Sequence, residues 1–228
     1  IGIIVIAIAF LPILKVGGMQ LFHTESSESS EKVLPRAAQI ASIIGIIYLF
    51  LTILCSGLLY FFGMPVFDSI AHSMTTLATG GFSTSDMSIG KYDNVNIELI
   101  ISLFMILGSL PFVLYLQTLR GNFFVIFKDS QVQFFLFLIV TSILIVTFWK
   151  YQDASNFFDN FRSSFFNTIS IFTGTGYTTQ NFNNWGSFII VLFLFLMLVG
   201  GCAGSTTCGI KIFRLQILYQ SAKIQLFK

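Results

Sequence analysis

Two short turns rich in Gly, Thr and Ser interrupt the apolar sequence, and both have a composition that suits ion binding by backbone. The first is LATGGFSTSD (77–86) and the second is IFTGTGYTTQ (171–180). Glycine permits backbone angles that other residues resist, so such turns can present carbonyl oxygens in a row. A row of carbonyl oxygens can replace the hydration shell of a cation. The turns therefore predict a cation filter made from backbone rather than from side chains.

The two turns belong to a repeat with an offset of 95 residues. SIAHSMTTLATGGFSTSDM (69–87) aligns with SFFNTISIFTGTGYTTQNF (164–182), so that Gly81 meets Gly176. A single turn of this kind suits an ordinary surface loop. A phosphate-binding loop is a weaker alternative, because neither copy ends in Gly-Lys-Ser/Thr. Two aligned copies favour one shared function over either alternative.

The composition is that of a membrane protein, with 55% hydrophobic and 10% charged residues and a mean hydropathy of +0.85. Soluble domains carry roughly 25% charged residues. A bilayer core of about 30 Å requires roughly 20 apolar residues per helix. Runs that meet this length are 37–63, 97–119, 132–149 and 187–219, with a shorter run at 1–14. Segments 67–77 and 161–172 are too short to cross, so we expect re-entrant helices that lead into the two turns.

The basic residues define an orientation. Nine Lys/Arg lie in segments 15–36, 120–129 and 211–228, including Lys211 and Arg214, whereas three lie in segments 64–96 and 150–186. The first set is therefore expected to face the cytoplasm. Both repeat units then begin and end inside, which makes the repeat parallel and unlike that of inverted-repeat transporters. No basic stripe interleaved with aromatic residues appears, which argues against a nucleic-acid partner.

A cluster of small residues divides the last apolar run. GGCAGSTTCG is expected to form an irregular loop at membrane depth beneath the filter, because its Gly and hydroxyl residues exceed what a helix tolerates. An alternative is a close helix contact of the GxxxG type. The loop comprises Gly200, Gly201, Cys202, Ala203, Gly204, Ser205, Thr206, Thr207, Cys208 and Gly209. GSLP (108–111) predicts a milder interruption in the preceding unit.

Candidate catalytic groups are sparse. Ionisable residues at membrane depth are costly and usually functional, and the nearest candidate is His72, which we expect to pack behind the filter. The cysteines Cys55, Cys202 and Cys208 are expected to be buried free thiols. We therefore expect no enzyme and no cofactor, with a membrane-embedded enzyme or a non-conducting structural domain as the alternatives.

Four motifs in order resemble one known family. AHSMTTLATGGFSTSD, NTISIFTGTGYTTQNF, LVGGCAGSTTCGIKIFRLQILY and LPILKVGGMQLF are similar to segments of the TrkH-type potassium-uptake proteins of the Trk/Ktr/HKT superfamily. The resemblance covers essentially the whole chain. It implies an all-α polytopic membrane fold like that of potassium channels, in which parallel units of helix, re-entrant pore helix with filter loop, and helix surround one pore.

The resemblance also implies residue roles. The 200–209 loop would be a gate that moves aside, and one aromatic in each turn would brace the filter from behind. Lys211 and Arg214 would anchor the chain at the inner side or contact a cytoplasmic partner. The filter would conduct potassium through the carbonyl groups of Thr79, Gly80, Gly81 and Phe82 and of Gly174, Thr175, Gly176 and Tyr177.

The expected organisation is an internal fragment of three repeats. It comprises the end of repeat 1 (1–22), a cytoplasmic connector (23–36), repeat 2 (37–120, pore loop 67–86), a cytoplasmic loop (121–131) and repeat 3 (132–228, pore loop 161–181). Without a first pore loop and a fourth unit, the fragment is not expected to conduct alone. The resemblance implies a multi-pass homodimer in the bacterial cytoplasmic membrane, bound to a cytosolic Rossmann-type nucleotide-binding regulatory subunit.

Overall fold

The computed structural model describes residues 37–119, 121, 124–151 and 157–226, and the regular elements in these ranges are helices. The expected end of repeat 1 and the connector (1–36) lie outside the described residues. The helices are α3 (Ala37–Phe61), α4 (Val66–Leu77), η1 (Ser88–Tyr92), α5 (Val95–Gly108), α6 (Phe112–Leu119), α7 (Val125–Lys128), α8 (Ser130–Lys150), α9 (Phe157–Phe172), η2 (Phe182–Trp185), α10 (Ser187–Leu198) and α11 (Ile212–Leu226).

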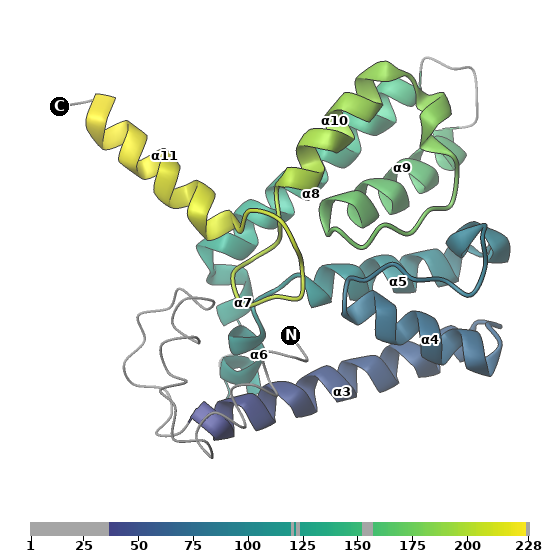
Figure 1. Ribbon diagram of the computed structural model, residues 1–228, viewed down its shortest axis with the longest axis horizontal. Helices are drawn as coiled ribbons and strands as arrows, with labels where there is room; N and C mark the ends of the chain where they lie inside the picture. The colour runs from purple at the N-terminus through teal and green to yellow at the C-terminus, as the bar shows by residue number, and fades with distance from the viewer. Residues whose placement is uncertain (1–36, 120, 122–123, 152–156, 227–228) are drawn as a thin grey trace.

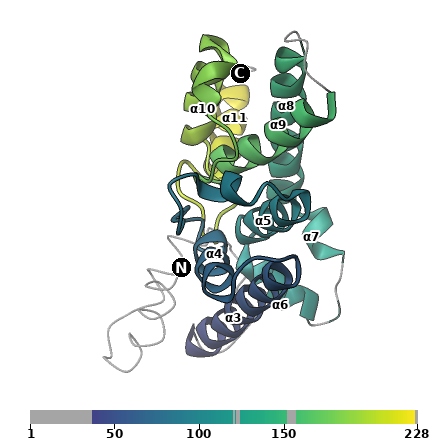
Figure 2. The same cartoon turned by 90° about the vertical axis from the view of Figure 1, so that its right-hand side faces the viewer.

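The helices form two similar groups that lie one beside the other (Figure 1). In the first group α4 packs on α3 and α5, and in the second group α9 packs on α8 and α10. The groups meet where α5 packs on α9, and the view turned by 90° agrees (Figure 2). In each group the middle helix is held between two helices that are more apolar than it is.

Among the residues that the structure describes, two helices are long and apolar enough to cross a bilayer, namely α3 over 41–61 and α8. Polar caps define where spans begin. Asp129 Oδ1 accepts hydrogen bonds from the backbone N–H groups of Gln131 (2.9 Å) and Val132 (3.1 Å) at the start of α8. Such caps satisfy N–H groups that have no partner within the helix.

The expected span 97–119 is not one helix. α5 and α6 are bent by 91° at their junction, so the mild interruption expected at 108–111 was wrong in degree. Pro111 has no N–H to donate and disfavours the helical conformation of the residue before it. The last apolar run is also divided, because α10 ends at Leu198 and α11 begins only at Ile212. In Figure 1 α11 points away from the rest of the second group.

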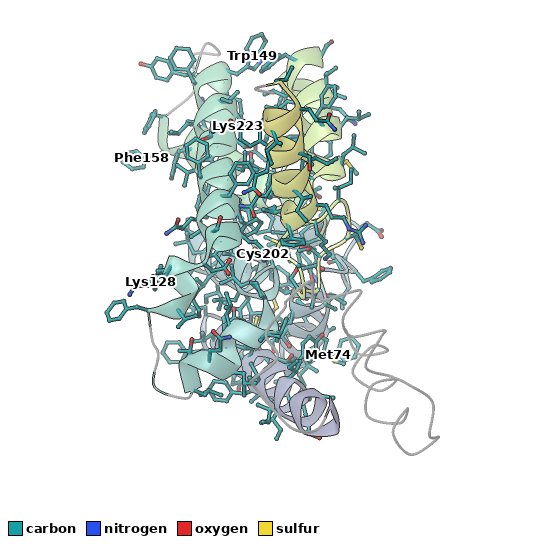
Figure 3. The ribbon with its side chains drawn as sticks, turned by 90° about the vertical axis from the view of Figure 1, so that its left-hand side faces the viewer. Met74, Lys128, Trp149, Phe158, Cys202 and Lys223 are labelled. Carbon is teal, nitrogen blue, oxygen red and sulfur yellow. The ribbon has the colours of Figure 1, made fainter. Side chains whose placement is uncertain are left out.

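Apolar side chains fill the interior and also cover the outside. Phe104 of α5 and Phe135 of α8 are buried, whereas Phe50 of α3 is 63% exposed and Leu144 of α8 is 60% exposed. In the side-chain view, Phe158 projects outward and Cys202 lies inside the ribbon (Figure 3). Helices that are apolar on every side are stable only in a core or a bilayer, so these outer faces suit contact with lipid.

Candidate functional site

The two Gly/Thr turns follow α4 and α9 and have the same backbone pattern. Thr79 and Gly174 have φ angles of 49° and 71°, and two residues later Gly81 and Gly176 have φ angles of 67° and 88°. In extended chain successive peptide units alternate in direction, and a left-handed residue at every second position turns their carbonyls to a common side. Both turns therefore have a conformation that suits a row of carbonyl ligands.

Equivalent hydroxyl groups close each turn. The Oγ1 atom of Thr75 donates to the carbonyl oxygen of Phe82 at 2.9 Å, and the Oγ atom of Ser170 donates to the carbonyl oxygen of Tyr177 at 2.7 Å. Each bond ties the far end of a turn to the helix that precedes it. The offset of 95 residues seen in the sequence thus extends to individual hydrogen bonds.

The turns touch each other. A β-carbon built on Gly81 would collide with the carbonyl oxygen of Thr175. Gly176 has open space at the same place, because no atom lies within 4 Å of its β-carbon position. The contact brings together two members of the predicted filter that are far apart in sequence.

The two aromatic residues of the turns differ in position. Tyr177 is fully buried, and its hydroxyl donates to the carbonyl oxygen of His72 at 3.2 Å and contacts Thr75 Oγ1. Phe82 is 78% exposed. The expectation that each aromatic braces its turn from behind is therefore wrong for Phe82, whose ring points away from the packed side, and agrees with the position of Tyr177.

His72 is a packing residue within α4. Its Nδ1 atom lies 2.7 Å from the carbonyl oxygen of Asp68, and its Nε2 atom lies 3.0 Å from Ser83 Oγ. The equivalent residue in α9 is Asn167, whose Nδ2 atom donates to the carbonyl oxygen of Ser163 at 2.8 Å. Both side chains thus bond to their own helix and also to the chain that follows the adjacent turn.

The 200–209 loop is irregular and closed at its neck. The N–H group of Gly200 donates to the carbonyl oxygen of Ile210 at 2.9 Å, and the N–H group of Ile210 donates to the carbonyl oxygen of Leu198 at 2.9 Å. Because no helix runs through residues 200–209, the alternative of a GxxxG helix contact is wrong.

The loop packs into the break between α5 and α6. A helix end leaves carbonyl and N–H groups without helical partners, and here the loop supplies them. The bonds run from Cys202 N to Ser109 O (3.2 Å), from Thr206 N to Gly108 O (3.1 Å) and from Phe112 N to Gly204 O (3.1 Å). The 200–209 loop, which follows about ninety residues later, therefore stabilises the sharp bend between α5 and α6.

The thiols, and the two basic residues near the loop, differ in their exposure to solvent. Cys55 and Cys202 are buried, but Cys208 is exposed, so the expectation of three buried thiols was wrong for Cys208. Lys211 donates from Nζ to the carbonyl oxygen of Thr207, whereas Arg214 is exposed. Cys208 lies beside Gly200 near the neck of the loop rather than within a helix.

Comparison with known families matches residues 1–227 to TrkH, described as a cation transport protein. The chain belongs to the TrkH family. The membrane class and the all-α fold expected from the sequence are confirmed. The expectation that the chain is not an enzyme is also confirmed, because the TrkH family consists of transport proteins.

Individual TrkH relatives extend the comparison. The Trk system potassium uptake protein TrkI of Halomonas elongata is 46% identical over 218 residues, which is 95% of this chain and 44% of the relative. TrkH of Salmonella typhimurium is 37% identical over 230 residues, which is 99% of this chain and 48% of the relative. The crystal structure of the potassium transporter TrkH from Vibrio parahaemolyticus matches with a TM-score of 0.82 at 35% identity, over 99% of this chain and 46% of that one. The chain spans about half the length of the relatives it matches.

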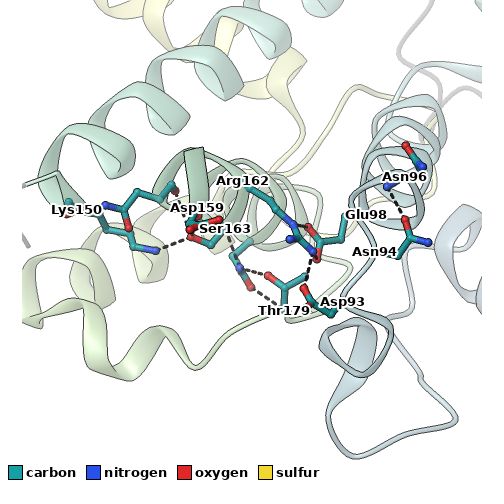
Figure 4. A network of polar contacts seen from close by, with 11 residues as sticks. Asp93, Asn94, Asn96, Glu98, Lys150, Asp159, Arg162, Ser163 and Thr179 are labelled. Carbon is teal, nitrogen blue, oxygen red and sulfur yellow. Dashed lines mark hydrogen bonds and ion pairs between the residues drawn. The ribbon is translucent and has the colours of Figure 1, made fainter. Parts of the chain in front are cut away.

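The chain also contains a polar network that the sequence did not reveal (Figure 4). Arg162 of α9 donates from Nε to Glu98 Oε2 at 2.8 Å and from Nη2 to Glu98 Oε1 at 2.9 Å. Its Nη2 atom also lies 2.9 Å from Asp93 Oδ1. Glu98 is the one acid within α5. A charged residue at the end of an apolar helix indicates that a partner of opposite charge lies nearby.

A second cation of the network lies at the end of α8. Lys150 is buried, donates from Nζ to Ser163 Oγ at 2.6 Å, and lies 3.8 Å from the ring centroid of Trp185. In the first group of helices, Tyr92 donates from its hydroxyl to Asp68 Oδ2 at 2.6 Å. Burial, and then the bond to Asp68, raise the pKa of Tyr92 to about 12. The N-terminal halves of α4 and α9 are thus both held by side chains from neighbouring segments.

We expect Tyr177→Phe to weaken the contact between the second turn and α4. The change removes the hydroxyl that donates to His72 O, which should lower the free energy of unfolding by about 1–2 kcal/mol. We also expect a lower preference for potassium over sodium, measured as competition against rubidium uptake by the full-length protein. Tyr115→Phe is the matched control, because its hydroxyl bonds Leu107 O at 2.7 Å within the α5–α6 region. An equal loss of selectivity in both variants would contradict this role for Tyr177.

Proposed function

We propose that this chain supplies two filter-bearing units of a potassium uptake protein. The observation that carries the proposal is the meeting of two equivalent turns with alternating left-handed residues, where Gly81 lies against the Thr175 carbonyl oxygen. Support also comes from the relatives, which are named as Trk system potassium uptake proteins. Two filter loops without further units are not expected to conduct.

In the proposed mechanism a potassium ion loses water as it enters the filter and gains carbonyl ligands. Transport is passive and follows the electrochemical gradient. The ligands are the carbonyl groups of Thr79, Gly80, Gly81 and Phe82 and those of Gly174, Thr175, Gly176 and Tyr177. Hydrogen bonds from Thr75 and Ser170 hold the ends of the two turns, which keeps the ligands in place when the ion leaves.

The 200–209 loop is the proposed gate. Its hydrogen bonds go to the ends of α5 and α6, to its own neck, to Thr79 and to Gln131 of α8, and no regular helix has to unfold for it to move. Segments with few regular backbone bonds rearrange at lower cost than core helices do. We propose that the loop obstructs the inner side of the filter when closed and withdraws towards the cytoplasm when open.

The proposed setting is the bacterial cytoplasmic membrane, which the protein crosses several times as a homodimer. A cytosolic Rossmann-type nucleotide-binding subunit is the proposed regulator, and Lys211 and Arg214 mark the side that would face it. The exposed helix α11 carries Arg214 and Lys223 on this side. The names of the relatives, which refer to a Trk system, are consistent with several components.

The test is Gly176→Asp in the full-length protein, expressed in a bacterial strain that lacks its own potassium uptake. A β-carbon at Gly176 meets no atom within 4 Å, but φ of 88° disfavours any other residue, and the new carboxylate would stand beside the ion path. We expect rubidium uptake to fall to the background of the strain.

Gly121→Asp is the matched control. Gly121 has a φ angle of 101° and likewise no neighbour within 4 Å, but it lies far from the filter in the predicted cytoplasmic loop. It should retain uptake. Normal potassium uptake by Gly176→Asp would refute the filter assignment.

A further inference from the structure

Thr79 occupies a backbone conformation that seldom suits a threonine. Its φ angle is 49°, and the equivalent residue in the second turn is Gly174 with a φ angle of 71°. β-branched residues are rare at positive φ, whereas Gly adopts it freely. The two turns therefore have different residues at the same backbone conformation. For the threonine, some interaction must offset the backbone strain.

The side chain of Thr79 makes such an interaction through its hydroxyl group. Its Oγ1 atom lies 3.0 Å from the carbonyl oxygen of Thr206 in the 200–209 loop and 2.8 Å from the carbonyl oxygen of Ala78. Thr79 is 5% exposed, so water does not readily replace these bonds. Of the two acceptors, only Thr206 belongs to the loop.

The Thr206 peptide is itself fixed. Its N–H group donates to the carbonyl oxygen of Gly108 at 3.1 Å, and its Oγ1 atom donates to the same oxygen at 2.8 Å. The carbonyl oxygen that receives the Thr79 hydroxyl is therefore held in one orientation by the end of α5. A bond between two fixed groups transmits displacement from one to the other.

The same part of the loop also lies against the second turn. A β-carbon on Gly174 would lie 3.9 Å from Cys208 N and 4.0 Å from Cys208 Cβ, which is ordinary contact distance. Residues 206–208 therefore reach the equivalent position of both turns. One turn contributes a hydroxyl to the contact, and the other contributes bare backbone.

We propose that Thr79 is a positioning residue that holds the 200–209 loop closed against the filter. The inference rests on the proposed function of that loop as a gate and assigns the contact that keeps it in place. Opening must break the bond between Thr79 Oγ1 and Thr206 O, so the loop position and the conformation of the first turn are coupled.

The experiment measures rubidium flux through the full-length protein reconstituted in liposomes without its regulator. Thr79→Val keeps the side-chain shape and removes the hydroxyl, and it should raise basal flux about threefold to tenfold, the change in population expected for one lost hydrogen bond. Thr79→Ser keeps the hydroxyl and should raise basal flux less than Thr79→Val does. Thr52→Val is the control, because Thr52 bonds only Tyr48 O within α3.

A second experiment combines Thr79→Val with a shortened 200–209 loop. If Thr79 had only a structural role, its effect on flux would not depend on that loop. In the shortened-loop variant Thr79→Val should not raise the basal flux further, because the part of the loop that Thr79 holds has been removed. Should Thr79→Val fail to fold, Thr206→Val removes the hydroxyl bond to Gly108 O that orients the acceptor and should raise basal flux in the same direction.

The outcomes distinguish the holding role of Thr79 from the proposed function of the protein. A conducting protein in which Thr79→Val matches the wild type overturns the holding role of Thr79 and leaves the proposed function intact. An increase that is equally large in the shortened-loop background also overturns it. A wild-type protein that carries no flux overturns the proposed function itself, and the inference with it.

Discussion

Gly81→Ala should abolish potassium uptake by the full-length protein, whereas Gly176→Ala should only reduce it. Both residues have positive φ, so both alanine variants incur a backbone strain of about 1–2 kcal/mol. Only the Gly81 variant also places its methyl group on the Thr175 carbonyl oxygen. Overpacking of this kind costs typically about 1–3 kcal/mol and shifts backbone, and here the displaced backbone is a proposed ion ligand.

Initial rates of rubidium uptake, normalised to the amount of protein in the membrane, measure this difference. Gly57→Ala is the control for a glycine replaced without strain or collision, because Gly57 lies within α3 and has no neighbour within 4 Å of its β-carbon position. It should retain full uptake. Equal rates for the Gly81 and Gly176 variants would show that the contact between the turns does not matter for transport.

Arg162→Ala should produce the largest loss of stability. Its removal leaves the carboxylate of Glu98, whose side chain is 7% exposed, without its partner. Leaving one member of a fully buried ion pair uncompensated costs about 3–5 kcal/mol, and because the guanidinium is 29% exposed we expect a loss below this range. Asp93 is the matched control, because its carboxylate is 87% exposed and pairs with the same guanidinium. Pairs at such an exposed position contribute about 0–1 kcal/mol.

Thermal unfolding of the purified protein in detergent at neutral pH distinguishes these cases. Arg162→Ala should unfold well below the wild type, and Asp93→Ala should remain close to it. Arg162→Lys should lie between them, because a single ammonium cannot replace the two parallel bonds of the guanidinium. If Asp93→Ala proves as unstable as Arg162→Ala, the buried pair is not the dominant contact between the two groups of helices.

The sequence predicted the parts of the fold that depend on local pattern. Apolar runs located α3 and α8, and the offset of 95 residues located both turns, because length and composition alone determine these features. α4 begins at Val66, close to the expected start. α9 begins at Phe157 rather than at 161, so Asp159 lies within its first turn instead of before it.

The parts that the sequence did not predict depend on contacts between distant residues. Glu98 and Arg162 are 64 residues apart, and nothing local pairs them. The full bend after Gly108 is stabilised by bonds to a loop that follows much later. The exposure of Phe82 likewise depends on which elements pack against the first turn, whereas Tyr177 is buried between α4 and its own turn.

The two inner helices are too short to cross the membrane. α5 has 14 residues and α10 has 12, which correspond to about 21 Å and about 18 Å against a hydrocarbon core of about 30 Å. Beyond their ends the irregular backbone requires protein or water as its surroundings. For the proposed filter this predicts that water from the cytoplasm reaches the two turns from below, so that the transmembrane voltage drops mainly across them. An ion that passes the turns would then account for most of the electrical work of crossing.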